Sequence, residues 1–517
     1  MATRKVGNRK PRQLRSTPTE SDIHSLLDRI DQAVMEGDAA ALTPLIERLW
    51  DARRQGPEVL TRRLLEGRAQ VPAFAFELLG GLAGPQTPRF LKRIAENPGV
   101  TDMVRFGAQR RAGWPERGEA KRRLAFLASL RDGEAALVTA AAEATLYWPP
   151  DGEILAEVLG YLSVLPAERR RAVLNRATAE LHARSTWLLR AVLHLADPVS
   201  QRFALAELVR LGDRGAIGPI ERVAHTAQTA EIRDEAAAAV RRLRMHVVNG
   251  TQREEAMELP PVERVLMSTI DGDGGQVILV VRKTEAGALL IADFFSNELY
   301  GVKDSFGLQH ATEDVLEEMI GELEESGIEL VEVDLAAARG ALAAAVEVNA
   351  ATRHSIPPVF ELWEPLVYDA YPPREDETIV RPELDDAPYA NRPDLIRSSG
   401  RLADRSCFDF WLFDLERTIL ALDAMPVPKG YRWSDKQFRP LVQQLLDSTA
   451  RELWRRRLRR QAWLLDRQGD SAGRDQSLAV AAQLAEGQVA DLAKQPFIRT
   501  LLQRTVGVVV AEMAFEE

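Results

Sequence analysis

The sequence of 517 residues is poor in the residues that most often carry metal or thiol chemistry. It contains one cysteine, Cys407, which excludes an intrachain disulfide and any cluster of thiolate ligands. Such sparing use of cysteine is typical of a reducing compartment, so we expect a cytoplasmic protein. The 7 histidines are scattered, and no two have the i, i+4 spacing that places metal ligands on one helix face. We therefore expect neither a metal centre nor a cofactor.

Long apolar runs are also missing. No stretch reaches the roughly 18 consecutive apolar residues of a membrane-spanning helix, so no membrane partner is expected. Residues 1–19 carry several basic side chains and no acidic one, and no apolar segment follows them as it would in a secretory signal. We expect these residues to form a disordered basic arm, with contact to nucleic acid or to an acidic partner as the alternative.

Common catalytic signatures are absent as well. The chain contains neither a Walker-type phosphate loop nor a Gly-x-Ser-x-Gly nucleophile motif. Its net charge of -10 argues against general coating of nucleic acid. With 45% hydrophobic and 28% charged residues it can bury several cores, and its length suggests about three domains.

Residues 20–247 alternate amphipathic segments with Gly and Pro breaks, which predicts many helices joined by tight turns. In the clearest unit, residues 191–243, Asp197-Pro198 opens a helix, Gly212-Asp213 closes it, and two helical segments follow. This unit resembles the HEAT repeat, in which paired helices stack on their neighbours. The resemblance implies an N-terminal α-solenoid that acts as a protein-interaction scaffold without catalysis of its own. It does not identify the partner.

Residues 260–366 predict a central α+β module. Three β-rich runs, at 262–270, 276–282 and 289–295, indicate an antiparallel meander, and an edge strand at 328–333 makes about four strands. Every residue from 277 to 281 is apolar, which predicts a strand covered on both faces, and the C-terminal helices are expected to pack near it. Two helices are predicted in the module, one acidic and one alanine-rich.

A glycine-bounded motif follows the third β-rich run, at Gly301-Val-Lys-Asp-Ser-Phe-Gly307, where we expect a tight backbone path. The motif and the meander before it resemble an uncharacterised bacterial α+β domain. The resemblance implies the fold of the module and brings no activity with it.

Asp271 and Asp273 open a sequence that begins like a calcium-binding loop. The twelfth position of that loop should be a bidentate Glu, and here it is Arg282. The segment also lies between predicted strands rather than helices. A Gly/Asp hairpin turn is the favoured interpretation, and a metal role for the two carboxylates is the alternative.

Asp293 interrupts an apolar strand, and Lys303 and Asp304 follow it in the glycine-bounded motif. A carboxylate on such a strand either pairs with a buried partner or lies in a cleft. A structural ion pair between Asp293 and Lys303 is the favoured interpretation. The alternative is an acidic enzyme site, for which spacing alone assigns no nucleophile or base.

A Pro- and acid-rich linker is predicted at residues 367–401, followed by a helical domain at 402–517. Within that domain we expect a helix at 408–422 whose apolar stripe is buried, and one long helix at 438–467. The polar face of the long helix carries a basic and aromatic set, Arg455, Arg456, Arg459, Arg460 and Trp463. This face is either solvated, paired with acidic segments of the same chain, or bound to nucleic-acid phosphates. The acidic net charge favours internal pairing.

The sequence thus predicts a mostly α protein with a helical-repeat solenoid, a central α+β module and a helical C-terminal region. The favoured function is a non-catalytic scaffold or adaptor for a protein partner. A nucleic-acid-associated protein using the helix face at 455–460 is the first alternative. An enzyme with an acidic site around Asp293, Lys303 and Asp304 is the second.

Overall fold

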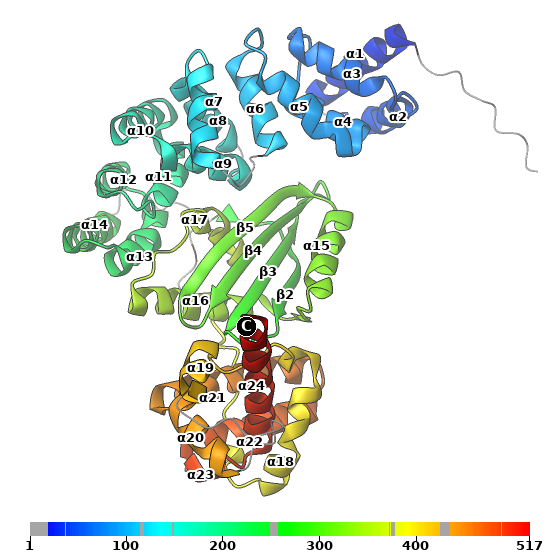
Figure 1. Cartoon of the computed structure of the whole chain (residues 1–517). Helices are drawn as coiled ribbons and strands as arrows, with labels where there is room; N and C mark the ends of the chain where they lie inside the picture. Colours follow the sequence, from blue (N-terminus) through cyan, green and yellow to red (C-terminus); the bar gives the residue numbers. More distant parts are fainter. Residues whose placement is uncertain are drawn as a thin grey trace, which may run out of the picture. The chain divides into compact units, whose positions relative to one another are not determined.

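The computed structural model describes residues 19–516 apart from 37, 114–117, 147–148, 249–256, 372, 374–377, 424–434 and 487–488. The predicted basic arm, up to residue 18, lies outside these residues. The chain is mostly α-helical, with a central α+β module and a helical C-terminal region (Figure 1). It forms two compact units, one of residues 1–140 and 160–173 and one of residues 141–159 and 174–517. In the described ranges no helix is long and apolar enough to cross a membrane.

The first unit is entirely helical in its described part. Its helices are α1 Glu20–Glu36, α2 Ala39–Trp50, α3 Gly56–Leu65, α4 Pro72–Ala83, α5 Thr87–Ala95, α6 Asp102–Ala112, α7 Glu119–Ser129, α8 Gly133–Ala144, α9 Gly152–Val164 and α10 Ala167–Leu181. The last three of these helices also contribute residues to the second unit. Asp38 and Thr101 cap α2 and α6 by accepting backbone N–H bonds. The fully buried Arg63 reaches Asp31 at 2.8 Å, so this unit contains a charged pair inside its apolar core.

The second unit begins its own helical series with α11 Thr186–Val192, α12 Pro198–Leu211, α13 Ile217–Thr226 and α14 Ala230–Val248. Asp197 caps α12 and Gly212 ends it in the left-handed conformation, as the sequence predicts. Helix α12 packs against α11 and α14, and α13 packs against α14. The helix-rich character of this region is therefore confirmed, while its identity as a HEAT-type stack stays a prediction.

The central sheet has five antiparallel strands in the order β5-β4-β3-β2-β6. The strands are β2 Val262–Ser268, β3 Gly275–Lys283, β4 Leu289–Asn297, β5 Gly301–Ala311 and β6 Leu330–Glu332. A separate pair joins β1 Met257–Glu258 to β7 Ala370–Tyr371. The expected edge strand near residue 330 is present as β6, which pairs with β2 at the edge of the sheet.

One strand was missed: the glycine-bounded motif, for which a tight backbone path was expected, forms the first part of β5. Lys303, Asp304 and the two glycines lower the β propensity of this stretch, yet β5 pairs with β4 along most of its length. As an edge strand, β5 exposes Lys303 and Asp304, which is how natural sheets protect their edges. Gly307 lies so close to the Trp363 ring that a side chain there would collide with it.

Both faces of the sheet are covered by helices, so β3 is buried on both sides as predicted. On one face, Leu266, Leu279 and Ile291 pack against α15 Glu313–Glu325 through Leu316 and Ile320. The other face contacts α16 Leu335–Thr352 and α17 Phe360–Trp363. The cover on β3 therefore comes from the module's own helices, while the C-terminal region packs near the sheet at its end through Arg460 and Gln461, as expected.

The C-terminal region consists of α18 Pro393–Ser398, α19 Leu415–Asp423, α20 Asp435–Leu445, α21 Ser448–Arg467, α22 Ser471–Glu486, α23 Val489–Leu492 and α24 Pro496–Glu516. The prediction of one long helix at 438–467 is wrong. Helix α20 ends at Leu445, and Asp447 caps the start of a separate helix, α21. The helix expected from residue 408 begins only at Leu415, although Phe408 and Trp411 lie in the core as expected. The predicted linker lies partly in short helical turns rather than being fully extended, with Ala387–Tyr389 and α18 inside it.

Candidate functional site

Helix α21 is fixed to one end of the sheet by buried polar contacts. The Arg457 guanidinium donates from Nε to Glu298 Oε1 at 2.7 Å, and both side chains are almost fully buried. Gln461 Oε1 accepts from the backbone N–H of Ile270 at 2.9 Å, and Trp411 Nε1 donates to the Ile270 carbonyl at 2.9 Å. These contacts hold the arginines of α21 in a defined position relative to the β2–β3 and β4–β5 turns.

Two of the predicted basic residues pair with the acidic linker. Arg455 Nε lies 2.7 Å from Asp386 Oδ2, and the Asp386 side chain is 1% exposed. Arg459 donates to the Leu384 carbonyl at 2.7 Å and lies 3.6 Å from a Glu383 oxygen. The other acidic segment considered for pairing, the helix now identified as α15, uses Glu317 to contact Arg264 instead. Internal pairing thus describes Arg455 and Arg459.

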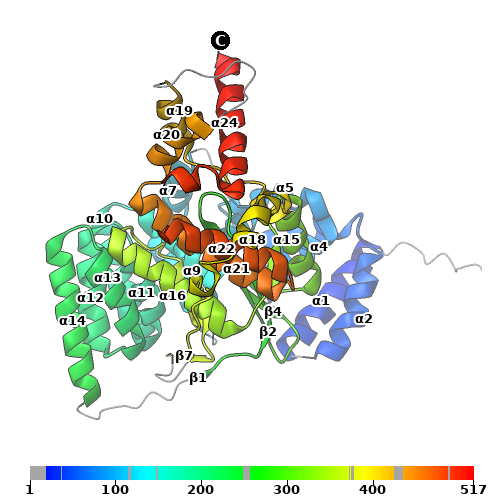
Figure 2. The ribbon, with the colours of Figure 1, turned by 90° about the horizontal axis from the view of Figure 1, so that it is seen from below.

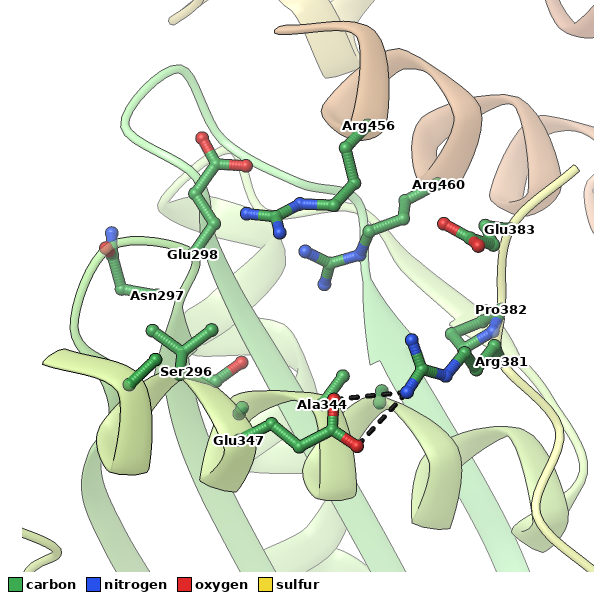
Figure 3. A pocket seen from close by; sticks show the side chains of 14 residues that line it. Ser296, Asn297, Glu298, Ala344, Glu347, Arg381, Pro382, Glu383, Arg456 and Arg460 are labelled. Atoms are coloured by element: carbon green, nitrogen blue, oxygen red, sulfur yellow. Dashed lines mark hydrogen bonds and ion pairs between the residues drawn. The ribbon is translucent and has the colours of Figure 1, made fainter. Parts of the chain in front are cut away.

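Arg456 and Arg460 have a different environment, because both face a cavity of about 260 Å³ (Figure 3). One wall is α16, another is the end of β4 at Ser296–Glu298, and a third is the linker segment at 381–383. Figure 2, which views the protein from below, also shows α16 near α21. The predicted basic face is therefore divided between internal ion pairs and this cavity.

The acidic residues around the cavity are each paired with another arginine. Glu347 contacts Arg381 at 3.1 Å, as the dashed lines in Figure 3 show. Glu298 is held by Arg457, and Glu383 lies beside Arg459. The carboxylates of the lining are thus already engaged outside the Arg456–Arg460 pair.

Within the described residues, Arg456 forms no hydrogen bond or ion pair. Arg460 forms one hydrogen bond, from Nη2 to Gln276 Oε1 at 2.7 Å, and no ion pair. Burial lowers the pKa of Arg460 below its ordinary value. Arg456 and Arg457 add to this change, while Glu298 and Glu383 oppose it. The two guanidinium groups therefore bring positive charge to the cavity without a matching protein anion.

Trp463, the remaining member of the predicted basic and aromatic set, is 6% exposed. The Arg467 guanidinium lies 4.8 Å from the centre of its ring. A ring buried in this way presents no free face on which a nucleic-acid base would stack.

Asp271 and Asp273 lie in the turn between β2 and β3. Asp271 Oδ1 accepts from the backbone N–H groups of Asp273 at 2.9 Å and Gly275 at 2.6 Å. Gly274 takes a φ of 81°, which favours glycine. The Asp271 side chain thus builds the turn itself. In the part of the chain that the structure describes, no group of three or more His, Cys, Asp or Glu is placed to hold a metal ion.

The structure places Asp293 near Asp304 but not in an ion pair with Lys303. Burial, with a smaller contribution from Asp304, raises the pKa of Asp293 to about 6. The Lys303 ammonium instead lies over the rings of Phe295 and Tyr300, at 5.6 and 5.5 Å from their centres. The expected ion pair is therefore not formed. Asp293 lies opposite Phe306 in the β4–β5 pairing, and the register shifts between Phe295 and Ser296, so Lys303 does not lie opposite Asp293.

Sequence reasoning selected Arg456 and Arg460 but missed the rest of the cavity. Glu298 stands next to a turn and carries no pattern of its own, and α16 was predicted only as an alanine-rich helix. Its small side chains at 341, 344, 345 and 348 follow the spacing of one helix face, which was an available signal for close approach or free space.

Comparison with known proteins covers one part of the chain. A family model described as the Y4lR C-terminal helical domain matches residues 378–510. The match includes α18 to α23, most of α24, and the linker segment beside the cavity, and it excludes the sheet and α16. No curated protein and no solved structure matches the chain. The C-terminal helices are thus similar to a named domain, and the other half of the cavity comes from the central module.

Proposed function

We propose that the protein is a non-catalytic adaptor whose interactions respond to a small anionic ligand bound between α16 and α21. One observation carries this proposal: Arg456 and Arg460 face a common cavity while the carboxylates around them pair with other arginines. Two cations that share a partly enclosed space attract an oxyanion, and arginine is the side chain best suited to bind one through paired N–H groups.

The position of α16 supports a link between the ligand and the helices that resemble a HEAT repeat. Helix α16 lines the cavity and also packs against α13. Helix α13 is also joined to α17 and the turn after it, because Arg222 forms ion pairs with Glu361 at 2.6 Å and Glu364 at 2.7 Å, all three side chains being buried or nearly so. A ligand that moves α16 would therefore act on α13 through direct packing. Residues 20–247 would provide the surface for a protein partner, with 260–366 and 402–517 as the ligand-binding domains.

The ligand part of the proposal is tested by calorimetric titration of the full chain with inorganic phosphate and pyrophosphate. Saturable binding is expected, with at least a tenfold loss in Arg456→Gln and in Arg460→Gln. Arg467→Gln is the matched control, because Arg467 lies on α21 but pairs with Asp334 outside the cavity. Heat signals that are equal in the wild type and both cavity variants would refute an anion site here.

The adaptor part is tested by affinity capture from native lysate with nuclease present, followed by mass spectrometry. We expect a defined protein partner whose retention changes when the anion is added, and whose response to the anion is lost in Arg456→Gln. Retention that is the same with and without anion would contradict a ligand-responsive adaptor.

Nucleic-acid binding is the second candidate, because Arg456 and Arg460 retain positive charge that is not paired internally. Arg455 and Arg459 are engaged with the linker, so few phosphate contacts remain on α21 and affinity should fall only shallowly with salt. Tight binding of single-stranded DNA that is lost in Arg456→Glu would favour this candidate over the adaptor.

A further inference from the structure

The cavity also indicates the kind of molecule that carries the anion. Most of the α16 wall is made of small apolar side chains on one helix face, Ala341, Ala344, Ala345 and Val348, and Pro382 adds an apolar side chain from the linker. Because these residues are spaced three and four apart, they form a continuous apolar strip. These five side chains offer no hydrogen-bonding atom, and Glu347 is the polar side chain that α16 adds to the lining.

On the opposite wall, the side chains of Ser296 and Asn297 are already engaged within the protein, whereas Glu298 Oε2 has no hydrogen-bond partner in the described chain. Ser296 Oγ donates to the Gln276 carbonyl at 3.3 Å. Asn297 donates from Nδ2 to the Asp273 carbonyl and accepts from the Leu299 N–H, both at 2.9 Å. A ligand with many hydroxyl groups would therefore lose hydrogen bonds to water without replacing them here.

The volume limits the ligand to a small molecule. A cavity of about 260 Å³ is smaller than the pockets that usually hold drug-sized ligands.

Resting on the proposed anion site, we infer that the ligand is a small amphiphilic acid, an oxyanion joined to a short apolar body. The phosphate or carboxylate group lies between Arg456 and Arg460, and the apolar body lies along the Ala341–Val348 strip of α16. Displacement of water from that strip adds to the affinity that the charge supplies. Phosphate and carboxylate heads share this chemistry, and comparison of the two distinguishes them.

The test compares probes of similar size on the full chain by calorimetric titration. Phenyl phosphate is expected to bind at least tenfold more tightly than inorganic phosphate or glycerol 3-phosphate, the factor expected for burial of about two methylene equivalents. Comparison of the affinities of benzoate and phenyl phosphate then shows which head group the arginines prefer. Tighter binding of benzoate would identify a carboxylate, and tighter binding of phenyl phosphate would identify a phosphate.

A variant that fills the apolar strip gives an independent readout. Ala344 is half-buried, so Ala344→Leu can project into the cavity, whereas Ala343→Leu changes the same helix outside the lining. Ala344→Leu should weaken phenyl phosphate at least tenfold and leave inorganic phosphate within about twofold, and Ala343→Leu should change neither. Arginine-dependent phosphate binding without any gain from the phenyl group would overturn this inference and leave the anion site standing. Failure of all the oxyanions to bind would overturn both.

Discussion

The guanidinium groups of Arg456 and Arg460 face one cavity from successive turns of α21, and neither pairs with a carboxylate of the described chain. The next arginine on the helix, Arg457, is instead buried in an ion pair with Glu298. Neighbouring residues of one basic run thus have opposite roles, one fixing the helix to the sheet and two bringing charge to an open space. Placing like charges together lowers stability, and proteins accept such a cost at functional sites.

Removal of Arg457 should be strongly destabilising. Arg457→Met leaves Glu298 buried without its cation, and we expect a loss of about 3–5 kcal/mol in the free energy of unfolding. The double variant with Glu298→Met should recover most of that loss, because a matched apolar pair avoids the buried charge. Urea denaturation followed by circular dichroism measures both. A loss below about 1 kcal/mol in Arg457→Met would show that the pair does not anchor α21.

Asp293 predicts a pH dependence of stability with a definite sign. Its pKa is raised from 3.8 to about 6 in the folded protein, so the folded state binds the proton more tightly than the unfolded state. The free energy of unfolding should therefore fall by at most about 3 kcal/mol as the pH rises from about 4 to about 6. Above that range, ionisation of Asp293 should cause no further decrease.

Asp293→Asn removes this titration and supplies the measurement. The variant should be more stable than the wild type at pH 8 and nearly equal to it at pH 4, in denaturation experiments at the two pH values. Equal stability of variant and wild type at pH 8 would mean that the Asp293 carboxylate is not desolvated.

Cys407 should be inert in the folded protein. It is 8% exposed, and burial raises the pKa of its thiol to about 12, so the reactive thiolate is scarce at neutral pH. We expect iodoacetamide to modify it only in denaturant, with a modification rate that follows unfolding. Rapid alkylation of the native protein, detected by mass spectrometry, would show that the segment around Cys407 opens readily.

The sequence was most informative where periodicity and composition agree. The buried run at 277–281 identified β3, and the Asp197-Pro198 start and Gly212 end located α12. Strand β5 was missed because its glycines and charged residues have low β propensity, and its extended structure depends on pairing with β4. The break before Asp447 was missed because the helical periodicity of α20 and α21 continues across it.

The candidate site was only partly predictable for a related reason. The arginines of α21 stand out in the sequence, but which of them pair internally depends on contacts with residues far away in the chain. Arg455 meets Asp386 and Arg457 meets Glu298, across separations of 69 and 159 residues. Spacing along a helix reports which side chains share a face and carries no information on what lies opposite them.

Arg456→Gln tests the central claim most directly, by measuring stability and ligand binding on the same protein. Because Arg456 forms no hydrogen bond or ion pair within the described chain and adds to the positive charge around Arg460, the unliganded variant should be as stable as the wild type or up to about 1 kcal/mol more stable. Its affinity for phosphate should fall at least tenfold, and Arg467→Gln should keep wild-type affinity. A variant that loses stability but binds phosphate normally would show that Arg456 is a structural residue and would contradict the account.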